Sequence, residues 1–318
     1  MLTQHTAVNT ADRPSNSLFQ QPWWLEAVAP GQWGLVEVRK NTELKAWMPY
    51  VLKKGPLFLQ RCSMPRLTQT LGPWIAPSNR SPVRALTEQH ELMNTLIEQL
   101  PDSDYFSQNL HYSVQNTLPF FWSGFQTKVS HTYVIEDLSD PDALWAGLHN
   151  RVRRHIKKAR KLVEVEWSDD INTFLSLNDM VFERQGIVVP YSHDYVKRLD
   201  RICAQRGQRH ILIARDHSGH PHAGLYIVFD ENAAYYLMTG TDPETRGSDA
   251  LSLLTWEAIL AAGKTSKTFD FEGSMMRRVE PFVRGFGATQ KSYYNVMKFS
   301  RRMKAMMAGR DFVSAFKG

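Results

Sequence analysis

The chain has 318 residues, of which 42% are hydrophobic and 22% are charged, a composition that excludes collagen-like, low-complexity and disordered proteins. The two cysteines, Cys62 and Cys203, lack the spacing of a disulfide framework or a cysteine-rich zinc site. The sequence contains no apolar run of the length that a signal peptide or a membrane span needs. We therefore expect a cytoplasmic protein with no integral membrane segment, long enough for two domains.

Apolar periodicity and turn residues predict a strand-rich first half. Alternating runs indicate a β-hairpin that turns at Lys40-Asn41, and Pro and Gly interrupt the stretch that follows. A leucine-rich helical spacing then ends at Pro101, and a strand and a short join come after it. In order, the predicted hairpin, loop, helix, strand and join are residues 34–52, 54–79, 85–100, 105–114 and 118–124.

The second half alternates strands with helices and contains three consecutive strands that are predicted to be antiparallel. The predicted strands are residues 131–135, 209–215, 223–229, 233–239, 268–271 and 292–299. The predicted helices are residues 140–161, 171–184, 194–206, 248–262 and 279–284. This order indicates a mixed α/β (α+β) fold.

Four segments together resemble the FemAB-like branch of the GNAT acyltransferase superfamily. They are residues 67–73, 151–159, 269–275 and 282–288. The resemblance implies two GNAT-like lobes, each a mixed, mostly antiparallel sheet flanked by helices, over residues 1–125 and 126–300, with a basic tail over 301–318. It also implies transfer of an acyl group, acetyl or aminoacyl, to an amine of a cell-envelope saccharide or peptide precursor. The donor would be an acyl-CoA or an aminoacyl-tRNA, with no tightly bound cofactor.

The positive charge is concentrated in one predicted helix. Residues 151–161 hold seven basic side chains and no acidic one, and without these seven the chain has 31 basic against 32 acidic residues. Such a run is either a solvated face or a binding site for phosphates of the acceptor or of a tRNA donor. We expect Arg154, Lys157 and Lys158 to bind these anions, together with Arg284, for which a structural link to Asp270 or Glu272 is the alternative.

Two carboxylates, Asp270 and Glu272, fall two residues apart on a predicted strand and therefore share one of its faces. Adjacent acids raise each other's pKa, which suits a general base that accepts a proton from an amine. The structural alternative is a cap for the following turn through Ser274, with a salt bridge to Arg277 or Arg278. The GNAT resemblance implies that the strand of Tyr236 splays open and that Tyr236 donates a proton to the leaving group, with core packing of this ring as the alternative. Met238 shares the predicted strand face of Tyr236.

The donor site implied by the resemblance is Met238 with Arg246, Gly247 and Ser248, which stand where GNAT proteins have a phosphate-binding loop. The usual glycines are missing, and Asp249 places a carboxylate at the helix N-terminus, where phosphate would bind. This departure favours a donor other than CoA, or an altered donor geometry. His217, His220 and His222 have metal-like spacing but lie in a hairpin turn without an acidic ligand set, so we expect no metal site.

The alternative from another functional class is a GNAT-fold protein that has lost its catalytic activity and binds nucleic acid or acts as a scaffold. The basic run and the altered phosphate loop are compatible with it. A nucleic-acid binder would lose affinity steeply with salt, whereas an enzyme that acts on a small precursor would not.

Overall fold

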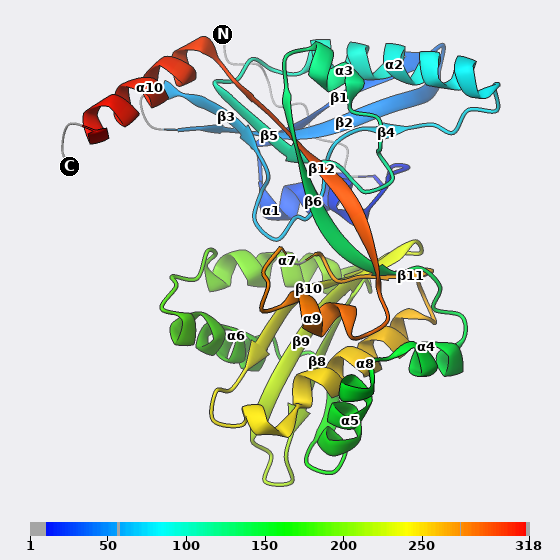
Figure 1. Ribbon diagram of the computed structural model, residues 1–318, viewed down its shortest axis with the longest axis vertical. Coiled ribbons are helices and arrows are strands. Elements are labelled where there is room, and N and C mark those ends of the chain that lie inside the picture. Colours follow the sequence, from blue (N-terminus) through cyan, green and yellow to red (C-terminus); the bar gives the residue numbers. More distant parts are fainter. Residues whose placement is uncertain (1–10, 56–57, 274, 316–318) are drawn as a thin grey trace. The chain divides into compact units, whose positions relative to one another are not determined.

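The protein was analysed as a computed structural model that describes residues 11–55, 58–273 and 275–315. The chain forms two compact units, which are described separately (Figure 1). Unit 1 comprises Met1–Ser130 and Ser292–Gly318, and unit 2 comprises His131–Lys291. Both units combine a mostly antiparallel sheet with helices, which confirms the predicted α/β class.

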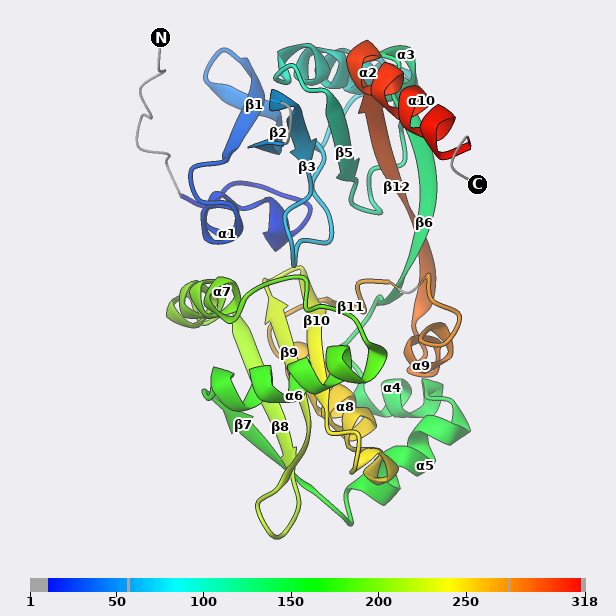
Figure 2. The same cartoon turned by 90° about the vertical axis from the view of Figure 1, so that its left-hand side faces the viewer.

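Unit 1 contains a sheet in the strand order β1-β2-β3-β5-β12, with the short strand β4 paired to β2. The strands are β1 (Trp33–Lys40), β2 (Glu43–Lys54), β3 (Gln60–Ser63), β4 (Trp74–Ile75), β5 (Tyr105–Asn109) and β12 (Thr289–Phe299). The helices are α1 (Pro22–Val28), α2 (Pro82–Gln99), α3 (Leu118–Trp122) and α10 (Arg301–Ala315). Helices α2 and α3 lie along one side of the sheet and α1 lies on the other (Figures 1 and 2).

The hairpin and the long helix of unit 1 are confirmed, whereas two predicted irregular segments contain regular structure. Strand β3 lies inside the predicted loop, where it pairs antiparallel with β2 and parallel with β5. The predicted join at residues 118–124 contains helix α3. The predicted basic tail forms helix α10 as far as Ala315. Short elements like β3 depend on non-local neighbours and leave little local pattern in the sequence.

Unit 2 has the strand order β6-β11-β10-β9-β8-β7. The strands are β6 (Gln126–Ile135), β7 (Glu164–Ser168), β8 (Arg209–Arg215), β9 (Pro221–Phe229), β10 (Ala233–Thr241) and β11 (Thr268–Asp270). The helices are α4 (Pro141–Gly147), α5 (Asn150–Ala159), α6 (Ile171–Gln185), α7 (His193–Gln205), α8 (Ala250–Ala262) and α9 (Glu280–Arg284). Helices α6 and α7 cover one face of the central strands, and α5 and α8 cover the other (Figures 1 and 2).

The predicted helix over residues 140–161 is interrupted and forms α4 and α5. Leu148 and His149 have extended backbone angles, and the His149 side chain accepts a hydrogen bond from Arg151 N at 3.2 Å, which starts α5. The apolar stripe of α5 is buried as its spacing predicts, with Val152, Ile156 and Ala159 at most 6% exposed. The basic side chains therefore occupy the remaining faces of the helix.

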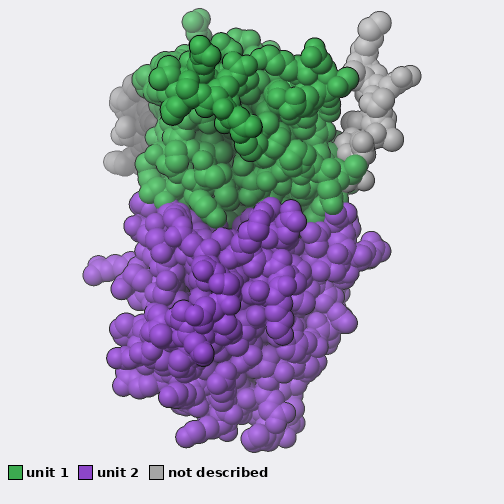
Figure 3. Space-filling view, turned by 90° about the vertical axis from the view of Figure 1, so that its right-hand side faces the viewer, with its two compact units in different colours: residues 1–130, 292–318 green, residues 131–291 purple. Residues whose placement is uncertain are grey.

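The chain passes between the two units inside strands β6 and β12, so the division falls after Ser130 and again after Lys291 (Figure 3). The sequence placed this boundary at residues 125 and 126 and kept the whole last strand with the second lobe. The two strands carry no turn or linker composition at the crossing points, so a composition-based boundary cannot find them.

Candidate active site

A cavity of about 590 Å³ opens in unit 2. Its wall is formed by β10, the segment after β11, the first turn of α8, helix α9 and the end of α6. The predicted site residues Glu272, Tyr236, Arg246 and Ser248 all line this cavity. Asp270, Met238, Gly247, Arg154, Lys157, Lys158 and Arg284 do not line it.

Glu272 lies just after the end of β11, at the wall of the cavity. Its backbone is left-handed, with φ of 56°, a conformation that residues other than Gly and Asn adopt mainly where function or packing requires it. Its Oε1 atom is buried and has no hydrogen-bond partner within the described residues. Burial and the neighbouring Asp270 carboxylate raise the pKa of Glu272 well above its usual range.

Asp270 supports the turn that holds Glu272. It is 1% exposed, and its Oδ1 accepts hydrogen bonds from Thr132 Oγ1 at 2.5 Å and from Glu272 N at 2.8 Å. The prediction that both carboxylates project from one strand face is wrong, because β11 ends at Asp270 and Glu272 adopts the left-handed conformation beyond it. Asp270 therefore supports this turn, while Glu272 is the carboxylate at the cavity. Within the described residues, which do not include Ser274, Glu272 forms no salt bridge with Arg277 or Arg278.

The next residue, Gly273, explains why the chain can turn so sharply here. Its φ is 82°, and a Cβ atom on it would lie 2.6 Å from the carbonyl oxygen of His131. Any larger residue would push this segment away from β6 and move Glu272.

Strand β10 carries a bulge at the cavity. Tyr236 pairs with Ile227 and Met238 with Tyr226, so Leu237 is the extra residue. Because Ile227 and Tyr226 lie on opposite faces of β9, Tyr236 and Met238 also lie on opposite faces. The prediction that they share a face is therefore wrong. Tyr236 and Leu237 line the cavity and Met238 does not.

The Tyr236 ring packs beside Phe271, with 5.6 Å between ring centroids, and its hydroxyl lies 3.5 Å from Thr255 Oγ1. Burial raises the pKa of Tyr236, so the phenol keeps its proton near neutral pH.

Strands β10 and β11 separate next to this bulge. They pair in parallel only from Ala233 to Tyr235, after which β11 ends while β10 continues to Thr241. Helix α6 supplies a hydrogen bond to the part of β10 that extends beyond β11: Asn178 Nδ2 donates to the Thr239 carbonyl oxygen at 2.6 Å. The splayed strand that the GNAT resemblance implies is thus present, with Leu237 at the cavity.

Three arginines line the same cavity from three segments of the chain. Arg184 is at the end of α6, Arg246 begins the short helix η3 (Arg246–Ser248), and Arg278 precedes α9. Within the described residues none of the three forms an ion pair with a carboxylate, and Arg278 donates to Gln185 Oε1. Burial and the charges of Arg246 and Arg278 lower the pKa of Arg184. This cluster is therefore an uncompensated cationic site of the kind that binds phosphate.

The first turn of α8 also faces the cavity. Asp249 has a left-handed backbone, and its carboxylate caps no helical N–H. It pairs instead with two side chains of α5, Lys158 Nζ at 3.1 Å and His155 Nδ1 at 3.7 Å. Lys158 also donates to the carbonyl oxygen of Gly247. Ser248 Oγ accepts from Ala250 N at 3.4 Å, but the residue at the N-cap position of α8 is Asp249.

The other predicted anion-binding side chains are placed away from this cavity. Arg284 forms a structural ion pair, but its partner is Glu280, at 2.7 Å, and not Asp270 or Glu272. Arg154 and Lys157 are exposed on α5. Of the remaining predicted residues, Lys158 is engaged with Asp249. The basic helix therefore contributes to the site mainly through Lys158 and His155.

Two histidines of the metal-like motif are held by aspartates. His220 Nε2 lies 2.7 Å from Asp242 Oδ2, and His222 Nε2 lies 3.2 Å from Asp216 Oδ2. In the described part of the chain, three or more potential ligands nowhere gather in a way that could hold a metal ion. His222 lines the cavity, a position that its motif did not indicate.

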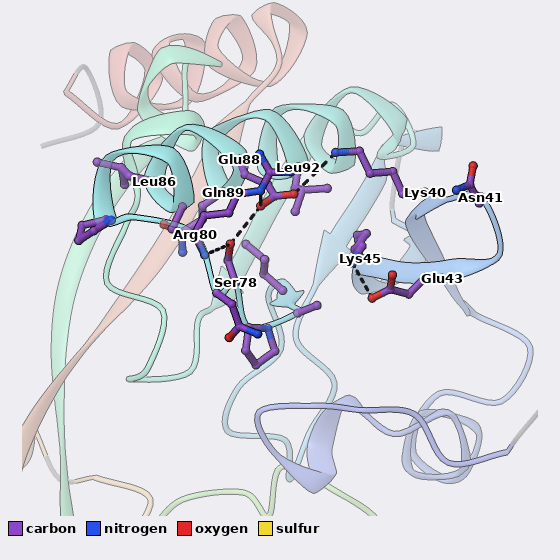
Figure 4. Close-up of a pocket in the computed structure, with 16 residues that line it drawn as sticks. Lys40, Asn41, Glu43, Lys45, Ser78, Arg80, Leu86, Glu88, Gln89 and Leu92 are labelled. Carbon is purple, nitrogen blue, oxygen red and sulfur yellow. Dashed lines mark hydrogen bonds and ion pairs between the residues drawn. The ribbon is translucent and has the colours of Figure 1, made fainter.

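Unit 1 has a larger cavity, of about 930 Å³, between the β1–β2 turn and α2 (Figure 4). Each of its three cations is paired with a carboxylate: Arg80 lies 3.3 Å and Lys40 3.7 Å from the shared carboxylate of Glu88, and Lys45 pairs with Glu43. It contains none of the predicted site residues. The cavity of unit 2 is therefore the candidate active site.

Comparison with known proteins agrees with this geometry. Residues 146–277 match the family described as an acetyltransferase (GNAT) domain. The matched residues all lie in unit 2. The matched segment contains β10, α8 and β11, which form most of the cavity wall, and the acyltransferase class predicted from the motifs is confirmed. No curated protein matches the chain.

Solved structures share the fold over nearly the whole chain. FemX aligns with a TM-score of 0.67 at 15% identity, covering 88% of this chain and 92% of FemX. The C-terminal domain of a lysylphosphatidylglycerol synthetase from Agrobacterium fabrum aligns with a TM-score of 0.53 at 14% identity, covering 87% of this chain and 88% of that one. A tandem GNAT protein from the clavulanic acid biosynthesis pathway aligns with a TM-score of 0.53 at 12% identity, covering 91% of this chain and 89% of that one.

These alignments confirm the fold of a FemAB-like, tandem GNAT protein. Among the described residues, no helix combines the length and the apolar character that crossing a membrane requires.

Proposed function

We propose that the protein is an N-acyltransferase that moves an acyl group, acetyl or aminoacyl, from an activated ester or thioester to an amine. The observation that carries the proposal is the unpartnered, buried carboxylate of Glu272 in a cavity that also holds three uncompensated arginines. The first feature suits a base, and the second suits a phosphate-bearing donor. Tyr236, which lines the same cavity, provides a proton donor.

Glu272 is the general base of this mechanism. Its raised pKa makes it a stronger base than an exposed carboxylate, so it can accept the proton that the amine loses as its nitrogen bonds to the acyl carbon. Asp270 acts as a positioning residue, because it holds Glu272 N and adds negative charge beside it. Asp270, the second base candidate of the sequence analysis, thus supports Glu272.

The bulged strand and Tyr236 act on the other side of the acyl carbon. Main-chain N–H groups of the open β10 stretch near Leu237 stabilise the negative charge that develops on the carbonyl oxygen. The C–O or C–S bond to the donor then breaks, and the Tyr236 hydroxyl gives its proton to the leaving oxygen or sulfur. The acyl group passes directly between substrates, without a covalent enzyme intermediate.

The donor is held by Arg184, Arg246 and Arg278 through its phosphates. Asp249 stands at the α8 N-terminus, where its carboxylate opposes binding of a pyrophosphate group to that helix. This arrangement favours an aminoacyl-tRNA or an acyl-CoA bound through the arginines over one bound through the helix end. The acceptor is an amine of a cell-envelope saccharide or peptide precursor, reached in the cytoplasm. FemX and a synthetase named for an aminoacylated lipid are consistent with an envelope acceptor.

The test is a transfer assay with labelled acetyl-CoA, other acyl-CoAs and aminoacyl-tRNA against amine-bearing muropeptides and nucleotide-linked amino sugars, with products identified by mass spectrometry. A thermal-shift series with the same donors runs in parallel, because a ligand of the folded state raises the melting temperature. Transfer from at least one donor, lost in Glu272→Gln, is the expected result. If no donor shifts the melting temperature and none supports transfer, the catalytically inactive binding protein is the better description.

A further inference from the structure

One face of the unit 1 sheet carries a continuous row of side chains that the proposed reaction does not use. Lys53 of β2 pairs in register with Arg61 of β3, Arg61 pairs with Tyr105 of β5, and Tyr105 pairs with Phe299 of β12. Residues directly opposite one another in a sheet project from the same face. The four side chains therefore form one row across four strands, which we call the basic aromatic row.

The rings of this row are stacked on one another and on a cation. Tyr105 and Phe299 have centroids 5.1 Å apart and an interplanar angle of 36°. The Arg61 guanidinium carbon lies 5.6 Å from the Tyr105 ring centroid. Arg61 is exposed, and Tyr105 and Phe299 are only partly buried. The row therefore offers flat aromatic surface with a guanidinium beside it.

The opposite face of the same strands is the core of unit 1. Cys62, Phe106 and Val296, which alternate with members of the row, are at most 3% exposed and belong to one apolar cluster. The row is thus not an extension of the core. It lies on the side of the sheet away from that cluster.

The row also carries positive charge without an internal counter-ion. Lys53 and Arg61 face each other directly, an unfavourable arrangement for like charges. Burial, with the charges of Arg66 and Arg61, lowers the pKa of Lys53. In the described ranges neither Lys53 nor Arg61 pairs with a carboxylate. Asp104, the acid that precedes Tyr105, already accepts from Gln60 N and Ser300 Oγ. An anion from outside would relieve the repulsion between the facing cations.

Hydrogen-bonding side chains continue the same face beyond the row. Ser63 pairs with Ser107, and Asn109 pairs with Asn295, whose Nδ2 donates to Ser107 Oγ at 3.1 Å and to Asn109 Oδ1 at 2.9 Å. At the other end, α10 begins with the exposed cations Arg301 and Arg302 just after Phe299. Aromatic rings, amides and cations on one sheet face are the groups that hold unstacked bases and their phosphates.

We propose that this face of unit 1 binds a single-stranded polynucleotide, with bases stacked on Tyr105 and Phe299 and phosphates held by Lys53 and Arg61. A membrane surface is the less favoured partner, because insertion into lipid needs apolar side chains that project from the molecule, whereas these rings lie in a row on a sheet. The inference does not depend on the transfer chemistry of unit 2.

The test is fluorescence anisotropy of the full chain with a labelled single-stranded RNA of about ten nucleotides, an order of size typical of such sites. Binding should weaken with salt with a logarithmic slope of about −1.4, or about −0.7 for each of two phosphates neutralised. Tyr105→Leu combined with Phe299→Leu should weaken binding about tenfold or more, and Tyr105→Phe should restore the stacking lost in Tyr105→Leu. Arg61→Gln should lower the salt slope, whereas Arg84→Gln on α2 is the matched control and should leave it unchanged.

A second measurement covers the case in which the leucine variants fail to fold. RNA containing 4-thiouridine is crosslinked to the wild-type chain, and the proposal requires crosslinks in peptides that contain Tyr105 or Phe299. The proposal is overturned if the RNA does not bind, if binding survives the folded leucine variants undiminished, or if crosslinks map only elsewhere. It is also overturned if vesicles of phosphatidylcholine and phosphatidylglycerol bind through Arg61 while the RNA does not.

Discussion

Replacing Glu272 by Gln separates the proposed base from its structural surroundings. The change conserves the size of the side chain and removes its ability to take a proton. The buried Oε1 atom has no hydrogen bond within the described residues, so an amide in its place loses no partner there. The left-handed backbone at residue 272 is the same in both proteins, because neither side chain relieves it.

A general base contributes roughly 10²- to 10⁴-fold to an enzymatic rate. At 1.36 kcal/mol per tenfold, the Glu272→Gln enzyme should lose about 2.7–5.4 kcal/mol of transition-state stabilisation, with little change in donor affinity. In the wild type, kcat/KM should rise with pH through the raised pKa of Glu272, and the variant should lack this limb.

The same substitution has an opposite effect on stability. Burial and Asp270 raise the pKa of Glu272 in the folded state, so folding favours the protonated acid. That contribution is complete below the unfolded pKa of about 4.3 and is lost as pH rises through the folded value. Gln stays neutral at every pH. The melting temperature of the variant should therefore rise relative to that of the wild type as pH increases.

The assay pairs single-turnover transfer with thermal unfolding between pH 4 and 9, and Glu231→Gln, an exposed carboxylate outside the cavity, is the matched control. Loss of activity with gained stability at high pH is the signature of a buried catalytic base. A variant that is fully active would refute the assignment of the base, and one that loses stability equally at every pH would refute the argument from burial.

Three further substitutions probe the surroundings of Glu272. Asp270→Asn keeps the hydrogen-bond acceptor for Glu272 N and removes the negative charge that helps to raise the pKa of Glu272. The acidic limb of the pH–rate profile should therefore move to lower pH. If the limb does not move, the charge of Asp270 does not influence the pKa of the base. Arg278→Gln should weaken donor binding by about tenfold, because it removes one charged hydrogen bond of roughly 1.5 kcal/mol. The control is Arg201→Gln on the exposed side of α7, which should leave the Kd measured by donor titration unchanged. Asp249→Asn should cost roughly 0.2–1 kcal/mol in urea unfolding through its lost ion pair, and yet should tighten donor binding several-fold. Weaker donor binding would mean that Asp249 helps to hold the donor.

Much of the fold follows from local patterns in the sequence. The β1–β2 hairpin, α2 and the antiparallel run β8-β9-β10 were all predicted, because each has a periodic apolar face and a clear turn at its end. Strands β3, β4 and β7 were missed. β7 leaves most of its side chains partly or fully exposed, β3 has only four residues and β4 only two, so none of them carries a clear apolar pattern.

The site was only partly readable from sequence, for a geometric reason. Motifs indicated Glu272, Tyr236 and Arg246 because each stands in a recognisable segment. Arg184 and Arg278 had no such signal, since a single arginine at a helix end or in a loop is usually solvated. The bulge at Leu237 was equally hidden, because the strand alternates on both sides of it and only the pairing with β9 reveals the extra residue.

The arginine cluster and the basic helix α5 show why charge in a sequence is a weak guide to a binding site. Helix α5 holds the densest run of cations, yet neither Arg160 nor Lys158 lines the cavity. Arg160 pairs with Glu257, and Lys158 pairs with Asp249. Arg184, Arg246 and Arg278 are far apart in the chain and are brought together only by the fold. Their mutual repulsion is unfavourable in the free protein, so a ligand that brings negative charge gains both its own contacts and the relief of that repulsion. Uncompensated charge, rather than abundant charge, is therefore the feature that marks the donor end of this cavity.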